Sequence, residues 1–516
     1  MVNINGSLII RGGNTADGNN DYVVNFYNKG QEICDYIDAN SKVNHTGRVI
    51  NRDKFFKPSV TWSKVTAGSI TFRYKPKGSI FDVAGTSIFG TDETLKSLIG
   101  FLNSNTVSSI LSCLSPTLNY EVGHICSIPV VNFEKEAIIS LVEKCISISK
   151  EDWDSHETSW DFKTNELLRI SLGLTNDQVE SSAMSDVCRS VSIESLVSRY
   201  KTYWKGQFMQ LHSNEEDLNR KFIEIYGLQD ELTPDVPLDE VTILQKGEIS
   251  IVDNQLEWHD DVILKQFISY LVGCFMGRFS VNKPGLIIAS QGQKVEDLDL
   301  PVQTLEIDDD GIIPIIQEED FFADDITQRI EAAIKTLFGE EHFYENIKYM
   351  KDILGLDLRD YLYKNYINDH QQMYSVLMNG SMAKRPIYWL FSSQMGDKKK
   401  KGYFKALVYM HRLEADTLSK LHADYVHPYI QKIEHQLIEA EDNATRDDLS
   451  QAQHNKALKQ AEELREKVRE VKAFETTLVE MASARITIDL DDGVKTNYPK
   501  FYPLVEPIKG LDSKDD

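Results

Sequence analysis

The chain has 516 residues, of which 41% are hydrophobic and 26% are charged, and its formal net charge is −24. This length and composition predict a soluble globular protein with two to four domains, each with a core of its own. The negative charge argues against a protein that contacts nucleic acid over its whole surface, because contacts to phosphate need Lys and Arg.

The sequence carries no sign of export or of a membrane anchor. Its N-terminus lacks the basic and apolar segments of a secretory signal. The longest apolar stretch, around residues 268–276, contains Gly273, is followed by Arg278 and is too short to span a bilayer. The 6 cysteines are scattered and form no C-x-x-C pair. We therefore expect reduced, mostly buried thiols in a cytoplasmic protein without membrane contact.

Charge is distributed unevenly along the chain. Residues 1–135 hold 13 Lys and Arg against 11 Asp and Glu, and residues 384–412 hold 8 against 1. Residues 293–325 hold 1 Lys against 12 Asp and Glu. This pattern favours a basic binding face on an acidic body, and the alternative is chance clustering on solvated surfaces.

The first predicted region, residues 1–135, mixes short strands with a helix. Residues 69–74 alternate apolar and polar side chains, which predicts a strand. Residues 93–114 place leucines and isoleucines at helical spacing, and Ser115-Pro116 ends that pattern. Residues 118–130 are expected to be extended.

The second region, residues 136–280, is predicted to be mainly helical. Its clearest helix has apolar side chains at three- and four-residue spacing: Ile193, Leu196, Val197, Tyr200, Trp204, Phe208 and Leu211. The aromatic side chains of Trp153, Trp160, Tyr200 and Trp204 are expected in the core rather than as platforms for stacking bases.

The third region, residues 281–415, begins with an acidic, loop-rich stretch and then has helical spacing over 326–378. It ends in a predicted β-hairpin, with strands over 386–391 and 402–409 and a polar loop that ends in four lysines.

The fourth region, residues 416–516, contains two predicted antiparallel helices of about four turns each. The helices are separated at 441–449, where Asp442 and Thr445 are the expected caps. The predicted fold class is therefore α+β.

Motifs of common enzyme classes are missing from the sequence. The 12 histidines form no H-E-x-x-H motif and no Cys/His zinc spacing, and no Walker A or G-x-S-x-G motif occurs. Residues 306–311 resemble the start of an EF-hand loop, but the twelfth position is Gln317, which cannot supply the bidentate carboxylate. We expect no metal site and no catalytic residue in this chain.

Six segments of unusual composition occur in a fixed order. They are Ile148–Asp154, Thr158–Phe162, Asn214–Asn219, Ile225–Leu232, Lys384–Trp389 and Asp491–Lys495. Together they resemble the C-terminal, target-recognition and helical portion of the PglX/BrxX family, the adenine-specific DNA methyltransferases of BREX phage-defence systems. They also resemble the related type IIG restriction-modification enzymes. The resemblance implies a protein of phage defence and host DNA marking, with S-adenosylmethionine as the methyl donor of the full-length family.

The two local motifs of an adenine methyltransferase are not found. One is a polar residue followed by two prolines and an aromatic residue, which holds the target amine and stacks on the flipped base. None of the 14 prolines is adjacent to another, so this motif is absent. The other is a Gly-rich turn for the cofactor, and the nearest match, residues 81–87, has one glycine where the motif has two. We therefore expect no cofactor in this chain.

The chemistry that remains is recognition of DNA by basic side chains. Residues 61–123 resemble the target-recognition region of the family, in which lysines and arginines contact phosphates around the bases that are read. The lysine run at the hairpin tip is a second dense positive charge, and solvated or solubilising residues are the alternative in both places. The expected DNA-binding residues are Arg73, Lys75, Lys77, Lys384, Arg385, Lys398, Lys399, Lys400 and Lys401.

Three functions remain open at this point. The chain is a DNA-binding specificity module with no chemistry of its own, a subunit that forms an active methyltransferase with a separately encoded catalytic chain, or a scaffold of the defence complex. The expected partners are double-stranded DNA, a methyltransferase catalytic domain or subunit, and other BREX proteins.

Overall fold

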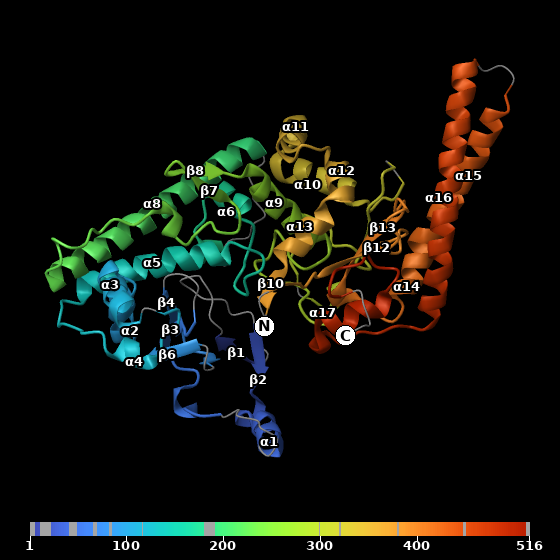
Figure 1. Cartoon of the computed structure of the whole chain (residues 1–516). Helices are drawn as coiled ribbons and strands as arrows, with labels where there is room; N and C mark the ends of the chain where they lie inside the picture. Colours follow the sequence, from blue (N-terminus) through green and yellow to red (C-terminus); the bar gives the residue numbers. More distant parts are fainter. Residues whose placement is uncertain are drawn as a thin grey trace. The chain divides into compact units, whose positions relative to one another are not determined.

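The computed structural model describes residues 6–10, 22–40, 49–65, 70–81, 85–115, 117–179, 191–298, 300–318, 321–378, 381–446 and 450–511. The chain divides into two compact units (Figure 1). Unit 1 comprises residues 1–154 and 201–259, and unit 2 comprises residues 155–200 and 260–516. The four consecutive regions expected from the sequence stay a prediction, since compactness does not show which segments fold separately.

The described residues of unit 1 form two small sheets, one β-hairpin and several helices. Its elements are β1 (Gly6–Ile10), β2 (Tyr22–Asn25), α1 (Gln31–Asn40), β3 (Ser59–Ser63), β4 (Phe72–Lys75), β5 (Ser79–Phe81), β6 (Gly85–Phe89), α2 (Asp92–Leu102), α3 (Asn105–Leu114), α4 (Val122–Cys126), α5 (Glu136–Asp154), β7 (Ile249–Val252), β8 (Gln255–Trp258) and most of α8 (Ile193–Tyr226). Strands β4, β3 and β6 form an antiparallel sheet in that order. Strand β1 pairs antiparallel with β2 and parallel with β5.

The core of unit 1 lies between the β4-β3-β6 sheet and helices α2, α3 and α5. Val60, Trp62 and Phe72 from the sheet meet Phe101 of α2 in this core, each at most 1% exposed. Helices α2 and α5 approach closely at Gly100, where a Cβ atom would lie 2.7 Å from Cγ2 of Val142. A side chain at this position would therefore force the two helices apart.

The single helix expected over 93–114 is wrong, because the structure has two helices there. Helices α2 and α3 meet at an angle of 73°. The side chain of Asn103, just after α2, accepts the backbone N–H of Phe72 and donates to its carbonyl, both at 2.9 Å. These hydrogen bonds hold the junction between α2 and α3 against Phe72, the first residue of β4. Among the described residues no single helix is long and apolar enough to cross a membrane, and only this bent pair passes that test when taken together.

Two further sequence predictions have opposite outcomes. Residues 118–130, expected to be extended, include the short helix α4, so that prediction is wrong. The helix through 193–211 is confirmed as part of α8, which has 34 residues. Its apolar face is at most 2% exposed at each of the seven positions: Ile193, Leu196, Val197, Tyr200, Trp204, Phe208 and Leu211.

The four aromatic side chains expected in the core divide into three kinds. Tyr200 and Trp204 are buried, as expected. Trp153 is half-buried, and the ammonium of Lys246 lies 5.0 Å from the centre of its ring. Trp160 is 58% exposed, so the core prediction is wrong for this residue. The side chain of Trp160 is exposed because it lies in a turn after α5 and not on the apolar face of a helix.

Unit 2 is mainly helical, and its described residues also form a three-stranded sheet and a two-stranded hairpin. Its elements are α6 (Glu166–Ser171), α7 (Asn176–Val179), the first turns of α8, α9 (Asp260–Phe275), β9 (Ile312–Pro314), α10 (Ile326–Phe338), α11 (Phe343–Leu354), α12 (Leu358–Lys364), α13 (Tyr366–Met373), β10 (Ser375–Met378), β11 (Ser381–Lys384), β12 (Tyr388–Ser392), β13 (Lys405–Tyr409), α14 (Thr417–Lys420), a π-helical turn (Leu421–Val426), α15 (His427–Ala444), α16 (Gln451–Ser483) and α17 (Gly493–Asn497). The mixture of helices and small sheets confirms the α+β class.

The predicted β-hairpin is confirmed. Strands β12 and β13 pair antiparallel from Tyr388 opposite Tyr409 to Ser392 opposite Lys405. Strand β9, from the stretch expected to be loop-rich, adds to the other edge of β13. All ten residues of β12 and β13 are buried. The rings of Trp389 and Phe391 pack against Phe501, near the end of the chain. The ring of Phe404, just before β13, packs against Tyr429 of α15 and Phe474 of α16.

The predicted antiparallel helices are also confirmed, as α15 and α16, and in Figure 1 their distal ends extend beyond the rest of unit 2. Of the two expected caps, Thr445 is confirmed as the C-cap of α15, whereas Asp442 lies inside that helix and Ser450 caps the start of α16. The Ser450 hydroxyl accepts the N–H of Gln453, whose side chain accepts the N–H of Ser450 in return. Helix α16 has 33 residues, about nine turns, so it is longer than expected.

Candidate nucleic-acid interface

Two of the three basic residues expected at and just after strand β4 are buried. Arg73 and Lys75, both on β4, are 2% and 1% exposed. The Arg73 guanidinium donates to the hydroxyl of Thr71 at 2.9 Å, and burial lowers the pKa of Arg73 to about 10. Lys77, in the turn after β4, is exposed. DNA contact by these residues stays a prediction, and for Arg73 and Lys75 it requires the side chain to leave the interior.

Lys384 and Arg385 connect the end of β11 to helix α13. The Lys384 ammonium donates to the side-chain oxygen of Gln371 at 3.0 Å. The backbone N–H of Arg385 donates to the carbonyl of Tyr374 at 2.8 Å. Both basic side chains are half-buried. They reach solvent in part, and their contact with DNA also stays a prediction.

Residues 393–404, which join β12 to β13, form what we call the lysine loop. Lys398, Lys399 and Lys401 are exposed and Lys400 is half-buried. The ammonium of Lys401 lies 3.6 Å from Glu466 and 3.9 Å from Glu463, both on α16. The other three ammonium groups form no ion pair within the described part of the chain. The lysines are thus not equivalent, and Lys398–Lys400 hold the free positive charge.

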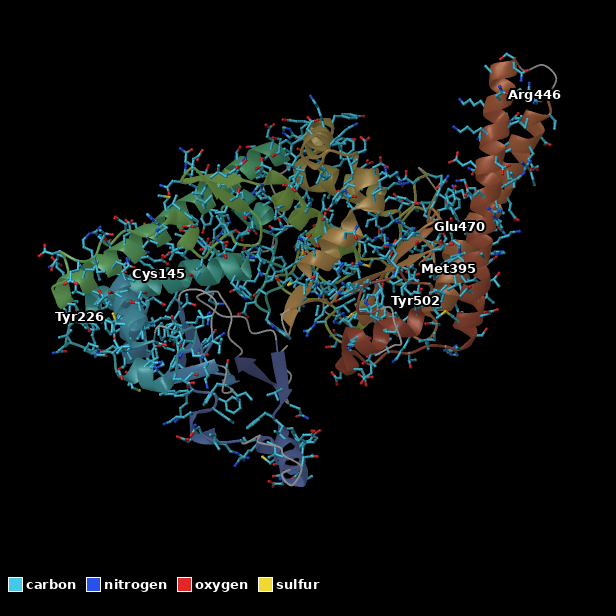
Figure 2. All side chains as sticks on the ribbon, in the orientation of Figure 1. Cys145, Tyr226, Met395, Arg446, Glu470 and Tyr502 are labelled. Carbon is cyan, nitrogen blue, oxygen red and sulfur yellow. The ribbon has the colours of Figure 1, made fainter. Side chains whose placement is uncertain are left out.

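A buried carboxylate on α16, that of Glu470, fixes the base of the lysine loop (Figure 2). One oxygen accepts hydrogen bonds from the Ser393 hydroxyl at 2.6 Å and from the backbone N–H groups of Gly402 and Tyr403, both at 2.9 Å. The other oxygen accepts the N–H of Lys401 at 3.0 Å. Four donors on one carboxylate hold the two ends of the loop together. Sequence reasoning missed Glu470, because its partners lie about seventy positions away.

The tip of the lysine loop is closed by its own polar groups. The Asp397 carboxylate accepts the N–H of Lys399 at 3.0 Å, and its carbonyl accepts the N–H of Lys400 at 2.9 Å. The side chain of Gln394 donates to the carbonyl of Lys400 at 3.1 Å. Such a turn presents its lysines with a defined backbone, which lowers the entropy that is lost on binding.

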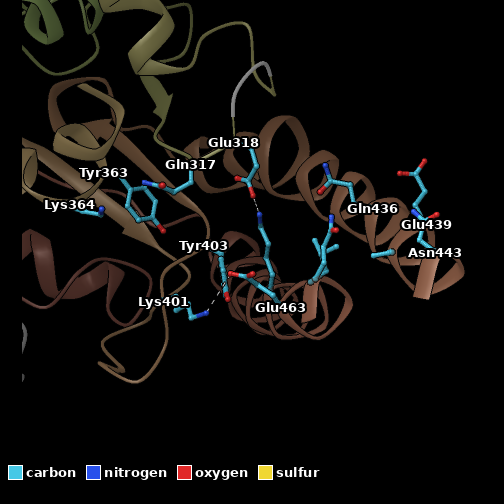
Figure 3. Close-up of a pocket in the computed structure, with 14 residues that line it drawn as sticks. Gln317, Glu318, Tyr363, Lys364, Lys401, Tyr403, Gln436, Glu439, Asn443 and Glu463 are labelled. Atoms are coloured by element: carbon cyan, nitrogen blue, oxygen red, sulfur yellow. Dashed lines mark ion pairs between the residues drawn. The ribbon is translucent and has the colours of Figure 1, made fainter. Parts of the chain in front are cut away.

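Beside the lysine loop lies an open pocket of about 640 Å³, lined by residues of α12, α15, α16 and the loop itself (Figure 3). The Lys467 ammonium forms an ion pair with Glu318 at this pocket. It also lies 5.6 Å and 5.3 Å from the ring centres of Tyr403 and Tyr429. Burial lowers the pKa of Lys467 to about 8. The lining has both signs of charge, so it favours neither an anion nor a cation.

A group of polar side chains that sequence reasoning also missed lies inside unit 2, beneath the start of β12. The His370 Nε2 atom accepts the backbone N–H groups of Ile387 and Tyr388, both at 3.2 Å, and burial together with Arg278 lowers the pKa of His370 to about 3. Glu157 accepts the hydroxyl of Tyr374 at 2.7 Å, and burial raises the pKa of its carboxyl. A neutral His370 thereby fixes the first residues of β12, close in sequence to Lys384 and Arg385.

The nearest Gly-rich turn, residues 81–87, falls partly outside the described residues, because residues 82–84 are not among them.

Comparison with known proteins identifies relatives over nearly the whole chain. No family model matches. The chain is 33% identical over 498 residues to the adenine-specific methyltransferase PglX of Lacticaseibacillus casei (strain Zhang), covering 94% of the chain and 37% of that protein. It is 31% identical over 516 residues to the adenine-specific methyltransferase BrxX of Escherichia coli O9:H4 (strain HS), covering 96% of the chain and 39% of that protein. The chain spans less than two-fifths of the length of these curated relatives. The resemblance carried by its six segments is confirmed, and the chain is related along nearly its whole length to part of the PglX and BrxX methyltransferases.

Proposed function

We propose that this chain is the DNA target-recognition and binding part of a BREX-type adenine-specific DNA methyltransferase, used in phage defence and host DNA marking. The observation that carries the proposal is similarity over at least 94% of the chain to two proteins named adenine-specific methyltransferases. The sequence has no adjacent prolines, so methyl transfer from S-adenosylmethionine belongs to a catalytic domain or subunit that joins this part. The proposed location is the cytoplasm, where the DNA lies.

The lysine loop is the part of the surface best suited to phosphate. Lys398, Lys399 and Lys400 have no carboxylate partner among the described residues, so a phosphate does not have to displace one. The bonds of Glu470 and Asp397 hold the loop backbone before DNA arrives. Charge that is already in place and unpaired contributes to affinity through release of counterions from DNA.

Lys401 has a different role in this proposal. Its ammonium is already attracted by Glu463 and Glu466 and lies 5.4 Å from the ring centre of Tyr403. A contact between Lys401 and phosphate would cost part of these interactions. We therefore assign the DNA-binding charge of this loop to Lys398–Lys400.

The test is binding of duplex DNA from a random-sequence library, measured by fluorescence anisotropy at several salt concentrations. The triple variant Lys398→Ala, Lys399→Ala, Lys400→Ala is expected to weaken binding and to reduce the slope of log K against log salt by up to about 2.7, since each phosphate neutralised contributes about 0.9. The control is the double variant Lys456→Ala, Lys459→Ala, which removes two exposed lysines of α16. Equal slopes for wild type and the loop variant would contradict the proposal.

A second function, as a scaffold of the defence complex, is favoured by one observation. Ile438 and Leu458, on α15 and α16, are 58% and 47% exposed. A contiguous exposed apolar surface marks a contact site for another protein, and in the scaffold hypothesis these two side chains belong to such a surface. If the chain acts as a scaffold, the double variant Ile438→Glu, Leu458→Glu is expected to lose co-purification with other BREX proteins. Its affinity for DNA is expected to stay unchanged.

A further inference from the structure

One histidine pair in unit 2 owes its position to a proline. Pro428 lies in the first turn of α15, directly after the π-helical turn, and it has no N–H to continue the helical hydrogen bonds. The N–H of His427 instead bonds to the carbonyl of His422, five residues earlier, which is the π-helical pattern. Residues five apart in an α-helix lie about 140° apart around the axis. The π turn therefore brings the side chains of His422 and His427 to one side.

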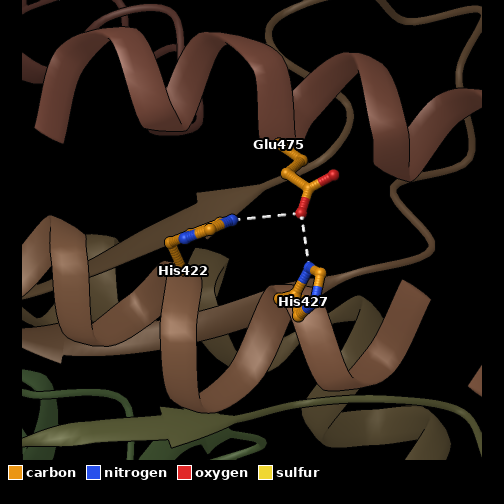
Figure 4. Close-up of side chains that lie close together, drawn as sticks. All are labelled: His422, His427 and Glu475. Atoms are coloured by element: carbon orange, nitrogen blue, oxygen red, sulfur yellow. Dashed lines mark hydrogen bonds and ion pairs between the residues drawn. The ribbon is translucent and has the colours of Figure 1, made fainter. Parts of the chain in front are cut away.

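A carboxylate from the neighbouring helix completes a set of three donors. One oxygen of Glu475, on α16, lies 3.0 Å from Nε2 of His422 and 3.1 Å from Nδ1 of His427 (Figure 4). The three donor atoms all lie within 4.8 Å of one another. The side chains of His422, His427 and Glu475 are 31%, 50% and 22% exposed, so the group lies at the surface and is open to solvent.

These distances suit a small metal ion. Zinc binds imidazole nitrogen and carboxylate oxygen at about 2.0–2.2 Å, so two ligands of a tetrahedral site lie about 3.3–3.5 Å apart. The two distances from Glu475 need to lengthen by only a few tenths of an ångström to reach that value, and the two histidine nitrogens, which lie within 4.8 Å of each other, need to take the same separation. Two imidazoles and one carboxylate are also a known ligand set for zinc, with the fourth position left to water.

The surroundings of His427 agree with both states of such a site. Without a metal, the Glu475 carboxylate accepts N–H from both rings, and Nε2 of His427 accepts from the Gln431 amide at 3.0 Å. A metal on Nδ1 moves the ring proton to Nε2, and rotation of the Gln431 amide then presents its oxygen as the acceptor. An outer partner of this kind orients the ligating ring.

We propose that His422, His427 and Glu475 form a binding site for one zinc ion, which fastens the start of α15 to α16. Nothing in the proposed DNA-binding function requires this site. A metal here links two segments that are about fifty residues apart in sequence and stabilises the base of the α15–α16 pair. The open fourth position holds water or a side chain of a partner.

The experiment uses the full chain, freed of metal by chelation, and measures binding of ZnCl₂ by isothermal titration calorimetry. We expect wild type to bind one zinc ion and to gain thermal stability. His422→Ala and Glu475→Ala are expected to lose both effects. Pro428→Ala keeps all three ligands but restores an α-helical turn, so it is expected to bind at least tenfold more weakly.

The matched control is His435→Ala, which removes a histidine of α15 that pairs with Glu439, one turn away. It is expected to bind zinc as wild type does. Circular dichroism verifies that each variant is folded, and the visible absorption of bound Co²⁺ reports a tetrahedral site in wild type. Absence of zinc binding by folded wild type, or equal binding by His422→Ala and Glu475→Ala, would overturn the site. Unchanged binding by Pro428→Ala would overturn the role given to the π turn.

Discussion

The lysine loop is predicted to depend on the carboxylate of Glu470. In Glu470→Gln, the amide oxygen can take the place of the carboxylate oxygen Oε1. It then still accepts the hydrogen bonds from Ser393, Gly402 and Tyr403. The NH₂ group then faces the N–H of Lys401, so that backbone donor loses its acceptor. A hydrogen bond to a charged group contributes about 1.5–3 kcal/mol, and an unsatisfied buried donor costs about 1–3 kcal/mol.

From these values we expect Glu470→Gln to lower the free energy of opening the loop by about 2–3 kcal/mol, and Glu470→Ala by about 3–5 kcal/mol. Hydrogen–deuterium exchange measured by mass spectrometry over residues 393–404 gives this quantity directly. A loss of about 2–3 kcal/mol corresponds to exchange that is roughly 30- to 140-fold faster.

The control for this prediction is Glu480→Gln, which changes an exposed carboxylate of the same helix. It is expected to leave exchange in the loop unchanged. If Glu470→Gln exchanges within about twofold of this control, the bonds to Glu470 do not hold the loop, and the argument for a preorganised cationic loop is refuted.

Three further predictions concern stability. Gly100→Ala is expected to destabilise unit 1 by about 1–3 kcal/mol in urea unfolding, and added Val142→Ala to restore part of it, because the new Cβ meets the Val142 side chain. Burial and the nearby Glu240 raise the pKa of Glu215 from 4.5 to about 7. The contribution of Glu215 to the free energy of unfolding is therefore largest below pH 4.5 and is lost as the pH rises through about 7. Glu215→Gln is expected to remove this loss and to be more stable than wild type at pH 8. Ser450→Ala is expected to cost about 1 kcal/mol, seen as faster hydrogen exchange in the first turn of α16.

Elements whose partners are close in sequence could be predicted well. The face of α8 from Ile193 to Leu211 follows from spacing alone, because one amphipathic stripe has to be buried somewhere. The β12–β13 hairpin follows from two apolar runs and a polar loop between them. Thr445 is the C-cap of α15, as expected, but the start of α16 is not among the predicted caps, although the capping box Ser450-x-x-Gln453 is present in the sequence.

The burial of Arg73 could not be predicted from its strand. Alternation in 69–74 indicates two faces but does not say whether distant segments cover the second face. In the structure Phe72 and Arg73, on opposite faces of β4, are 1% and 2% exposed. The same limit applies to Trp160, whose exposure depends on a turn and not on a periodic pattern.

The site residues that the sequence did not reveal are those with remote partners. Glu470 reads as one more acid on a charged helix, and its role appears only when the lysine loop folds against it. Glu475 and His422 are 53 positions apart, so no local motif connects them. Pro428 was visible in the sequence, but a π turn is one of several ways in which a chain accommodates proline.

The proposed contact with DNA is compatible with a net charge of −24, because charges act over short distances in salt. At physiological ionic strength screening limits the interaction between exposed charges to about 8 Å. DNA that approaches the lysine loop therefore meets Lys398–Lys401 with Asp397, Glu463 and Glu466 beside them, and not the average charge of the chain. Because two of these carboxylates are engaged with Lys401, the remaining lysines keep a local positive excess. The acids of α16 thus serve the loop in two ways, since Glu470 fixes its backbone and Glu463 and Glu466 hold one lysine back while the others face solvent.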